Sequence, residues 1–267
     1  MGRHHFHPVD ERYTPEDIAY LDRAAALKEI RAIKLRSYAA LGPLRGVRLL
    51  EVGCGTGDDA ARLARAVGPE GNVVALDSNA AMLAEARARF GQVANLRFEL
   101  GAAAALPFTA GAFDAVRADR VVHLVADPGA ALAEMVRVLR PGGRLAISEP
   151  DWRSLVVEGG DADTTRAILD GLASGPRPST ADFVALVQAA GLTIDAVLPD
   201  TLVITDVESA YELFRLGYLA LAQVQRLGID AAAAKRWLAS LETAAAEGRF
   251  RSALTGVTIS ATRDGGR

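Results

Sequence analysis

The stretch Glu51–Gly57, which reads EVGCGTG, decides the fold of this chain. It follows a short apolar run at residues 49–52 and precedes residues 58–67, which have the composition of a helix. Glycine takes up backbone conformations that are closed to other residues, so a turn rich in glycine lets the backbone approach a ligand closely. The N–H groups of such a turn can hydrogen-bond a carboxylate or a phosphate. The stretch therefore predicts a ligand-binding turn between a strand and a helix.

On both sides of this turn, short apolar runs alternate with helical patterns. Further strands are expected at residues 73–76, 96–100, 113–117 and 144–148, with helices at residues 80–90 and 128–139 between them. This alternation predicts right-handed crossovers and a parallel sheet that is covered by helices on both faces. In such sheets, ligands bind at the carboxyl ends of the strands. The fold class is therefore α/β, Rossmann-like and doubly wound.

The rest of the chain predicts helical additions to this core. Thr14 and Pro15 are typical of a helix start, and the helix, with a break, runs towards Leu41 before Gly42. Beyond Pro150 we expect helices at residues 161–172, 180–190, 206–226 and 230–246, an extended segment at 193–205 and a last strand at 251–262. We expect a single domain with four parts: an N-terminal helical lid (1–45), a ligand-binding core (46–150), helices with a sixth strand (151–250) and the last strand (251–262).

Composition excludes several classes of protein. The 267 residues carry a formal net charge of −3 without a basic stripe, so nucleic acid is not an expected partner. No apolar run approaches the ~18 residues of a membrane span, and residues 1–10 lack the apolar segment of a secretory signal. The single cysteine, Cys54, allows no intrachain disulfide and is consistent with the cytoplasm. His4, His5 and His7 lack acidic or cysteine partners, so no metal site is expected.

An acidic residue, Asp77, ends the second predicted strand, 22 residues after Gly55. A carboxylate at this place can accept both ribose hydroxyls of a nucleoside through charge-assisted hydrogen bonds. The dinucleotide fingerprint is G-x-G-x-x-G, whereas this turn reads G-x-G-x-G. Glu51 suits the positive amino group of a methionine moiety and would repel a pyrophosphate. The spacing and Glu51 therefore favour S-adenosylmethionine (SAM) over NAD.

Residues 48–149 resemble the core of class I SAM-dependent methyltransferases, in a branch similar to the ubiquinone and menaquinone biosynthesis methyltransferases. The segments that carry the resemblance follow the family's order: the turn at 51–57, VALD at 74–77 with Met82 and Leu83, LPF at 106–108, FDAV at 113–116 and EMVRVLRPGGRL at 134–145. The resemblance implies a seven-stranded, mostly parallel sheet with an antiparallel last strand. It also implies SAM as cofactor and S-adenosylhomocysteine (SAH) as its product.

The resemblance also places the cofactor, position by position. It puts the methionine and ribose parts along the turn, with Glu51 reaching the amino group through water and Asp77 holding the ribose diol. The expected cofactor-binding residues are Glu51, Gly53, Gly55, Thr56, Gly57, Asp77, Ser78, Met82, Ala102, Ala103, Asp119 and Arg120. Relatives often have Gly-Asp-Ala where this chain has residues 101–103, Gly-Ala-Ala, so an acidic contact to the adenine amino group is missing here.

His123 follows the fourth strand, where the resemblance places the transferable methyl group. An imidazole has a pKa near neutrality and can act as general base, or it can pack as a structural histidine. The expected acceptor-pocket residues are Tyr13, Tyr20, Glu149, Asp151, Trp152, Tyr211, Phe214 and Tyr218. The last three of these share one predicted helix face, and an aromatic stripe at this spacing is more often core than pocket.

The sequence leaves more than one function open. The first is methyl transfer to a small-molecule acceptor with an aromatic, quinone-like or natural-product scaffold, by a monomer or homodimer. The second keeps the fold and SAM but catalyses another reaction, such as a cyclisation. A nicotinamide oxidoreductase is a third reading, against which the turn spacing argues. DNA or protein methylation is disfavoured because no basic face and no Asn/Asp-Pro-Pro-aromatic tetrapeptide is present.

Overall fold

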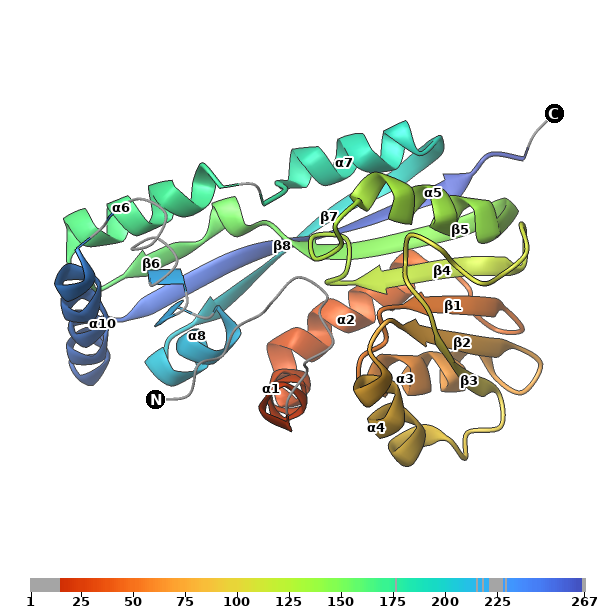
Figure 1. Ribbon diagram of the computed structural model, residues 1–267, viewed down its shortest axis with the longest axis horizontal. Helices are drawn as coiled ribbons and strands as arrows, with labels where there is room; N and C mark the ends of the chain where they lie inside the picture. Colours follow the sequence, from red (N-terminus) through yellow and green to blue (C-terminus); the bar gives the residue numbers. More distant parts are fainter. Residues whose placement is uncertain are drawn as a thin grey trace. The chain divides into compact units, whose positions relative to one another are not determined.

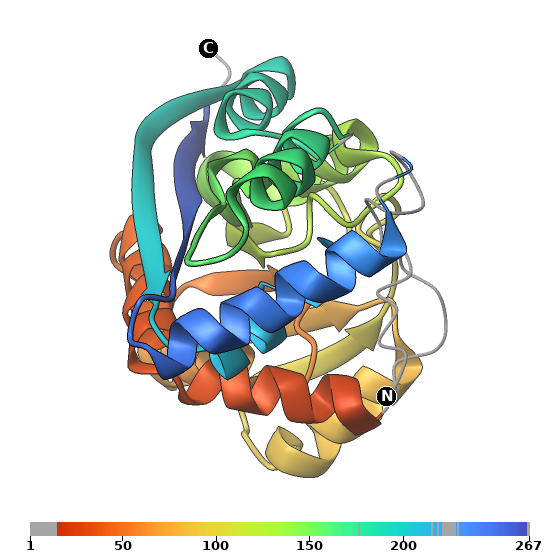
Figure 2. The same ribbon diagram turned by 90° about the vertical axis from the view of Figure 1, so that its left-hand side faces the viewer.

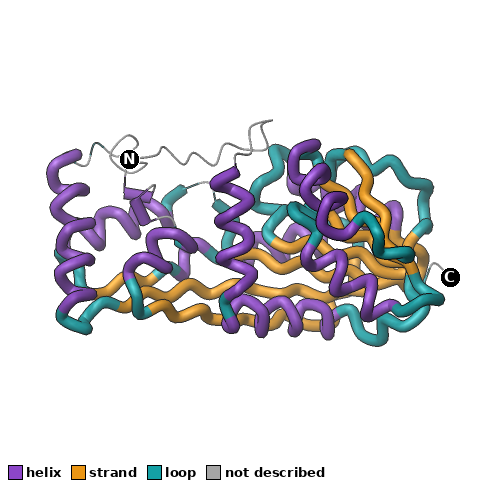
Figure 3. The backbone as a smooth tube through the Cα atoms, turned by 90° about the horizontal axis from the view of Figure 1, so that it is seen from below, coloured by secondary structure: helices purple, strands orange, loops and turns teal. Residues whose placement is uncertain are grey.

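The computed structural model describes residues 15–175, 177–214, 216–217, 219–220, 228 and 230–265; the remainder is grey in Figure 3. The chain divides into two compact units. The large unit contains residues 15–149, 181–198 and 257–265, and the small unit contains the described residues of 150–180 and 199–256. The boundary at Pro150 falls where the expected ligand-binding core ends.

A parallel sheet forms the centre of the large unit. Its strands β1 to β5 lie in the order β3-β2-β1-β4-β5 (Figure 1). The pairs β1–β2, β1–β4, β2–β3 and β4–β5 are all parallel. Their bounds are β1 Arg48–Val52, β2 Asn72–Asp77, β3 Leu96–Leu100, β4 Phe113–Asp119 and β5 Leu139–Pro150. The order reverses at β1, so the turn that follows β1 lies at the topological switch point of the sheet.

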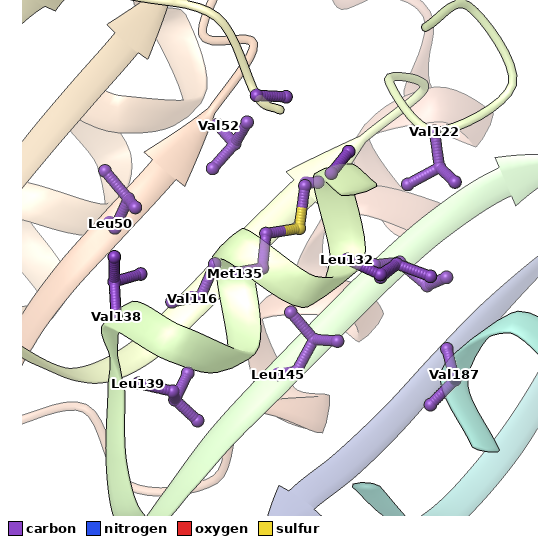
Figure 4. Packing of buried hydrophobic residues seen from close by; sticks show 14 of the residues in the cluster. Leu50, Val52, Val116, Val122, Leu132, Met135, Val138, Leu139, Leu145 and Val187 are labelled. Carbon is purple, nitrogen blue, oxygen red and sulfur yellow. The ribbon is translucent and has the colours of Figure 1, made fainter. Parts of the chain in front are cut away.

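Helices cover both faces of this sheet, and alternate residues of each strand serve opposite faces. Leu49, Val73 and Ala75 pack with α2, α3 and α4, while Leu50, Val52 and Val74 pack with α5 and α7. Figure 4 shows side chains of the cluster that contains Leu50 and Val52, with Met135 among them. Burying each of the leucine and valine side chains among these contributes about 1.5–3 kcal/mol. The helix bounds are α1 Pro15–Ala26, α2 Lys28–Ala40, α3 Asp58–Val67, α4 Ala80–Phe90, α5 Pro128–Val138 and α7 Thr180–Ala189.

Local sequence fixes where these helices begin. Asn79 caps α4, its side chain accepting the N–H groups of Ala81 and Met82. Asp127 caps α5, whose first residue is Pro128. Both arrangements satisfy N–H groups that have no partner inside the helix. The expected break in the N-terminal helix falls at Leu27, which has an extended backbone conformation.

In the small unit, aspartates begin each helix whose cap is described. Asp151, Asp161, Asp206 and Asp230 accept N–H groups at the starts of η1, α6, α8 and α10. Helix α10, the long blue helix of Figure 2, packs against α6 and α8. The buried Trp237 of α10 donates its indole N–H to Thr165 Oγ1 at 2.7 Å. The bounds are η1 Trp152–Ser154, β6 Val156–Glu158, α6 Ala162–Ala173, α8 Val207–Leu213 and α10 Ala231–Ala246.

The doubly wound α/β class is confirmed, with two differences in detail. The sheet has eight strands rather than seven, because the short β6 pairs antiparallel with β8 (Arg251–Arg263). Strand β7 (Leu192–Ile204) also pairs with β8. The helix expected at 206–226 is described as α8 only as far as Leu213, and residues 221–227 lie outside the described ranges. Among the described residues, no helix is both long and apolar enough to cross a membrane.

Candidate functional site

The turn after β1 is held open by its glycines and by the end of β2. Gly53 and Gly55 have φ angles of 71° and 53°, in the left-handed region that favours glycine. A Cβ at Gly53 would collide with Val121, whereas at Gly55 it would meet only Leu21 Cδ1, at 3.4 Å. The N–H of Gly53 donates to the carbonyl of Leu76. The turn is therefore tied to the strand that carries Asp77.

Asp77 faces this turn from the carboxyl end of β2. Its Oδ2 accepts the N–H of Gly55 at 2.8 Å, and its Oδ1 accepts the N–H of Asn79 at 2.9 Å. Burial raises the pKa of the carboxyl, and its hydrogen bonds from the backbone oppose that rise. A carboxylate offers about four acceptor positions, so Asp77 keeps capacity for a ligand's hydroxyl groups. It is fixed in place before any ligand binds.

Glu51, at the other side of the turn, is almost completely buried. Its Oε1 accepts a charge-assisted hydrogen bond from Nη1 of Arg117, while its Oε2 has no partner among the described residues. Burial raises the pKa of Glu51 to about 8, with Arg117 opposing that rise. An unsatisfied buried acceptor costs about 1–3 kcal/mol. Such an orphaned oxygen is the natural receptor for a cationic group or a water molecule.

Arg117 belongs to a buried network that also involves α2 and α3. Its Nε and Nη2 donate to Ser37 Oγ at 3.0 and 2.9 Å, and its guanidinium lies 4.8 Å from the ring centre of Tyr38. The Tyr38 hydroxyl donates to Asp59 Oδ1 at 2.7 Å. Lys34 Nζ lies 2.5 Å from Asp59 Oδ2. The N-terminal helix α2 is thus linked through Arg117 to Glu51, beside the glycine turn.

None of the residues Lys34, Ser37, Tyr38, Asp59 or Arg117 is in the set that the sequence predicts. Two signals in the sequence point to them. Arg117 is flanked by Val116 and Ala118 in a predicted strand, and an arginine at such a place is exceptional, since charged side chains are almost never fully buried unless they are paired. The three α2 residues are spaced i, i+3 and i+4, which places them on one helix face.

The site fits the amino-acid and ribose parts of the expected cofactor. Glu51 Oε2 is an acceptor without a partner, Asp77 presents a preorganised carboxylate, and the glycines leave room between them. Around the expected adenine position, Ser78 and Ala102 are exposed, while Met82 and Ala103 are buried. These residues offer apolar contact and no acidic group.

Three further expected cofactor residues have partners inside the protein. The buried Thr56 donates its hydroxyl to Asp58 Oδ2 at 3.1 Å. Asp119 lies 3.4 Å from Lys34 Nζ and 3.3 Å from Arg117 Nη2, so it is part of the buried network. Arg120 directly follows β4 and has a φ angle of 57°, which is unusual outside glycine.

The side chain of Arg120 contacts the N-terminal helix. Its Nη1 lies 3.4 Å from the hydroxyl of Tyr20 in α1, and its backbone N–H donates to the carbonyl of Ser148. Tyr20 was expected in the acceptor pocket, and Arg120 in the cofactor site. The structure therefore brings one residue from each expected set into contact, at the carboxyl end of β4.

His123 forms a pair with Glu149 from the end of β5. Nδ1 of His123 lies 2.5 Å from Oε2 of Glu149. Oε1 of Glu149 accepts the N–H groups of Val121 and Val122 at 3.0 and 2.7 Å. The Glu149 side chain is fully buried, and these contacts support His123 and the loop. The sequence predicts both residues but not their contact.

The other expected pocket residues lie in the small unit or outside the described residues. Asp151 caps η1 and also accepts the hydroxyl of Thr180 at 2.9 Å, and Trp152 packs under Arg177. Phe214 is buried. The Tyr211 hydroxyl donates to the carbonyl of Leu238 at 2.9 Å, and burial raises its pKa to about 12. Tyr13 and Tyr218 fall outside the described residues.

Comparisons with known proteins show that this chain is similar to methyltransferases. A family model described as a methyltransferase domain matches residues 44–174. An uncharacterized 37.1 kDa protein in transposon TN4556 of Streptomyces fradiae is 36% identical over 251 residues, covering 92% of this chain and 71% of that protein. A ubiquinone/menaquinone biosynthesis C-methyltransferase of Methylobacterium nodulans is 36% identical over 186 residues, covering 60% of this chain and 72% of that enzyme.

Other relatives and solved structures extend the comparison. The chain spans only 50% and 44% of the length of two further curated methyltransferases. The crystal structure of the [4+2]-cyclase SpnF matches with a TM-score of 0.56 and 21% identity, covering 91% of this chain and 85% of that one. At this identity the likeness concerns the fold alone.

Proposed function

The chain belongs to the family of class I SAM-dependent methyltransferases, and from this premise we propose that it transfers a methyl group from SAM to a small-molecule acceptor. The observation that carries the proposal is the preorganised carboxylate of Asp77, fixed by the N–H groups of Gly55 and Asn79 at the mouth of the glycine turn. A carboxylate held in this way can accept a ribose diol without a further loss of conformational entropy.

The residues around the turn define where the cofactor is held. Asp77 takes the ribose hydroxyls, and Glu51 Oε2 takes the amino group, either directly or through water. Ser78, Met82, Ala102 and Ala103 border the adenine. When bound, SAM supplies an electrophilic methyl group on a sulfonium sulfur. The protein's task is to align an acceptor with that methyl group and to exclude water from it.

His123 and Glu149 supply a base for acceptors that must lose a proton. A neutral imidazole carries one N–H, and the contact with Glu149 Oε2 places that proton on Nδ1. Nε2 is then the acceptor nitrogen, available to take the proton of an acceptor hydroxyl as the methyl–oxygen bond forms. The buried carboxylate also stabilises the imidazolium that results, in the manner of an Asp–His pair.

The acceptor class follows from the relatives and remains part of the proposal. The curated relative from Methylobacterium nodulans is named for ubiquinone and menaquinone biosynthesis. We therefore propose an aromatic, quinone-like or natural-product scaffold, bound on the side of Tyr20 and Arg120.

A thermal-shift titration with SAM, SAH and NADH in parallel tests the cofactor. A ligand that binds only the native state must raise the melting temperature. A rise with SAM and SAH alone supports the proposal, and a rise with NADH alone contradicts it. Mass spectrometry of candidate acceptors after incubation with SAM then separates methyl transfer, which adds a methyl group, from a cyclisation, which leaves the acceptor's mass unchanged.

A further inference from the structure

The ion pairs of the buried network beneath the glycine turn involve more carboxylates than cations, and a further, partly buried cation, Arg120, lies near Asp59 and Asp119. Among the described residues, its ion pairs join two cations, Lys34 and Arg117, to three carboxylates, Glu51, Asp59 and Asp119. Arg117 is fully buried, and the side chains of the other four are at most 13% exposed. Solvent screens such groups weakly, so a buried carboxylate oxygen without a partner here has a strong tendency to bind a proton or a cationic group.

Glu51 has a carboxylate oxygen, Oε2, without a hydrogen-bond partner among the described residues. The elements packed around Glu51 contribute charged or titratable groups: Arg117 and Asp119 from β4, Asp59 from α3, Lys34 and Tyr38 from α2, and Cys54 from the turn itself. Asp77 of β2 faces Cys54, and Arg120 faces Asp59 and Asp119. None of these groups donates a hydrogen bond to Glu51 Oε2.

Arg117 fixes which oxygen of Glu51 is free. Its Nε and Nη2 are both bound to Ser37 Oγ, which orients the planar guanidinium, and its Nη1 then binds Glu51 Oε1. The ring of Tyr38 packs against the same guanidinium. A rigid planar fork can serve two partners in fixed directions, which a lysine ammonium cannot do.

We propose that Arg117 is a positioning residue of the cofactor site, which holds Glu51 so that Oε2 receives the cofactor's ammonium group, and that this binding displaces a proton from Glu51. The inference rests on the proposed function, since it takes SAM and SAH as the ligands. Arg117 touches neither ligand nor reacting atoms, and acts through Glu51.

The proton accounting follows from the surroundings of Glu51. With a pKa of about 8, the carboxyl is mostly protonated at neutral pH before the ligand binds. An ammonium group next to Oε2 favours the carboxylate, so the pKa falls on binding. The proton is released to the buffer. The negative charge that the Glu51 carboxylate gains then offsets part of the positive charge that the ligand's ammonium group brings. Affinity for the ligand therefore increases as the pH rises from about 6 towards 8.

Calorimetric titration with SAH at neutral pH tests the inference without any turnover. Titrations in phosphate and in Tris, which differ in ionisation enthalpy, give the number of protons released on binding. The wild-type protein is expected to release a large fraction of one proton, and Glu51→Gln close to none. Free SAH is the same in both titrations, so proton release that appears with wild-type protein and disappears with Glu51→Gln is assigned to Glu51. Equal proton release by the two proteins would overturn the inference.

Variants of Arg117 test the positioning role. Arg117→Met is expected to weaken SAH binding by about tenfold or more, and Arg117→Lys by nearly as much, since lysine restores charge without the fork. Arg97→Met is the matched control, because Arg97 is 63% exposed and pairs only with Glu99 in the described structure. Unchanged affinity in Arg117→Lys would overturn the positioning role.

Two outcomes separate this inference from the proposed function. If wild-type protein binds no SAH at all, the proposed function fails. If it binds SAH without releasing a proton, only the inference fails. Should Arg117→Met fail to fold, shown by loss of its melting transition, the comparison of wild-type protein with Glu51→Gln still decides whether Glu51 exchanges a proton.

Discussion

The carboxylate of Glu149, at the end of β5, holds the imidazole of His123 with an Oε2–Nδ1 distance of 2.5 Å. The same side chain receives the N–H groups of Val121 and Val122 through its other oxygen. One buried carboxylate therefore fixes both the loop after β4 and the tautomer of the histidine that the loop carries. The loop and its imidazole behave as one preorganised unit rather than as a mobile side chain.

Replacing Glu149 by glutamine should separate these two duties. The glutamine oxygen can still accept the N–H groups of the loop, but its amide nitrogen cannot accept the Nδ1 proton of His123. The imidazole then carries its proton on Nε2 and cannot act as a base there. We expect turnover to fall about a hundredfold or more, with SAH affinity within about twofold of wild type.

His123→Gln is the companion variant and should show the same loss of turnover. For both variants we would measure steady-state turnover with an identified acceptor and, by calorimetry, the affinity for SAH. Wild-type turnover in both variants would demote the pair to a structural contact. A fall in the SAH affinity of both variants, with turnover at saturating SAM unchanged, would instead assign them to cofactor binding.

Asp77→Ala should weaken SAH binding by about tenfold or more, because charge-assisted hydrogen bonds to the ribose are lost. The same change removes the acceptor of the Gly55 N–H, so part of the loss reflects a less ordered turn. Asp163→Ala is the control, since the Asp163 side chain is 92% exposed. Equal affinities for Asp77→Ala and wild-type protein in calorimetry would remove Asp77 from the ribose site.

Gly55→Ala and Gly46→Ala form a matched pair. Both glycines have positive φ angles, 53° and 76°, so alanine costs each variant about 1–2 kcal/mol of backbone strain. Neither new methyl group meets a protein atom closer than 3.4 Å. Only the methyl group at position 55 projects into the expected cofactor space. We therefore expect the melting temperatures of both variants to fall by similar amounts. We expect SAH binding to be lost in Gly55→Ala alone. Full binding by Gly55→Ala would refute the assignment of the turn.

The fold was largely predictable because short local segments of the sequence specify its strands, turns and helices. The apolar runs at 49–52 and 73–76 are short, turn residues separate them from helical segments, and the order of the segments specifies the crossovers. The short β6 was not predictable, since Val156–Glu158 is three residues long and alternates only once. Its pairing with β8, nearly a hundred residues later, depends on tertiary contacts.

The candidate site was predictable only where one segment carries its own chemistry. The glycine turn and Asp77 can be read from strand ends. The network around Arg117 cannot, because it joins α2, β1, α3 and β4 through side chains that are up to 85 residues apart, as Lys34 and Asp119 are. The contact of His123 with Glu149 likewise needs β4 and β5 to be neighbours. The arginine between Val116 and Ala118 signals that a buried partner must exist, and the helical spacing of the α2 residues is the second signal.

Glu51→Gln should change how the stability of the ligand-free protein depends on pH. The pKa of Glu51 in the folded protein, about 8, lies above the ordinary carboxyl value of 4.5. The folded state therefore binds this proton more tightly than the unfolded chain. The stability that this contributes is fully present below pH 4.5 and is lost as the pH rises through about 8.

Glutamine cannot titrate, so the variant should gain stability relative to wild type as the pH rises. Between about pH 6 and about pH 8, the difference in the free energy of unfolding should change by about 2 kcal/mol. Urea denaturation of both proteins at the two pH values measures it. Asp77, whose pKa is also raised, is present in both proteins and cancels in the comparison. The lowered pKa of Asp59 acts at more acidic pH, outside this window. A difference that stays constant with pH would mean that Glu51 is already ionised in the folded protein, paired with Arg117 as a fixed charge.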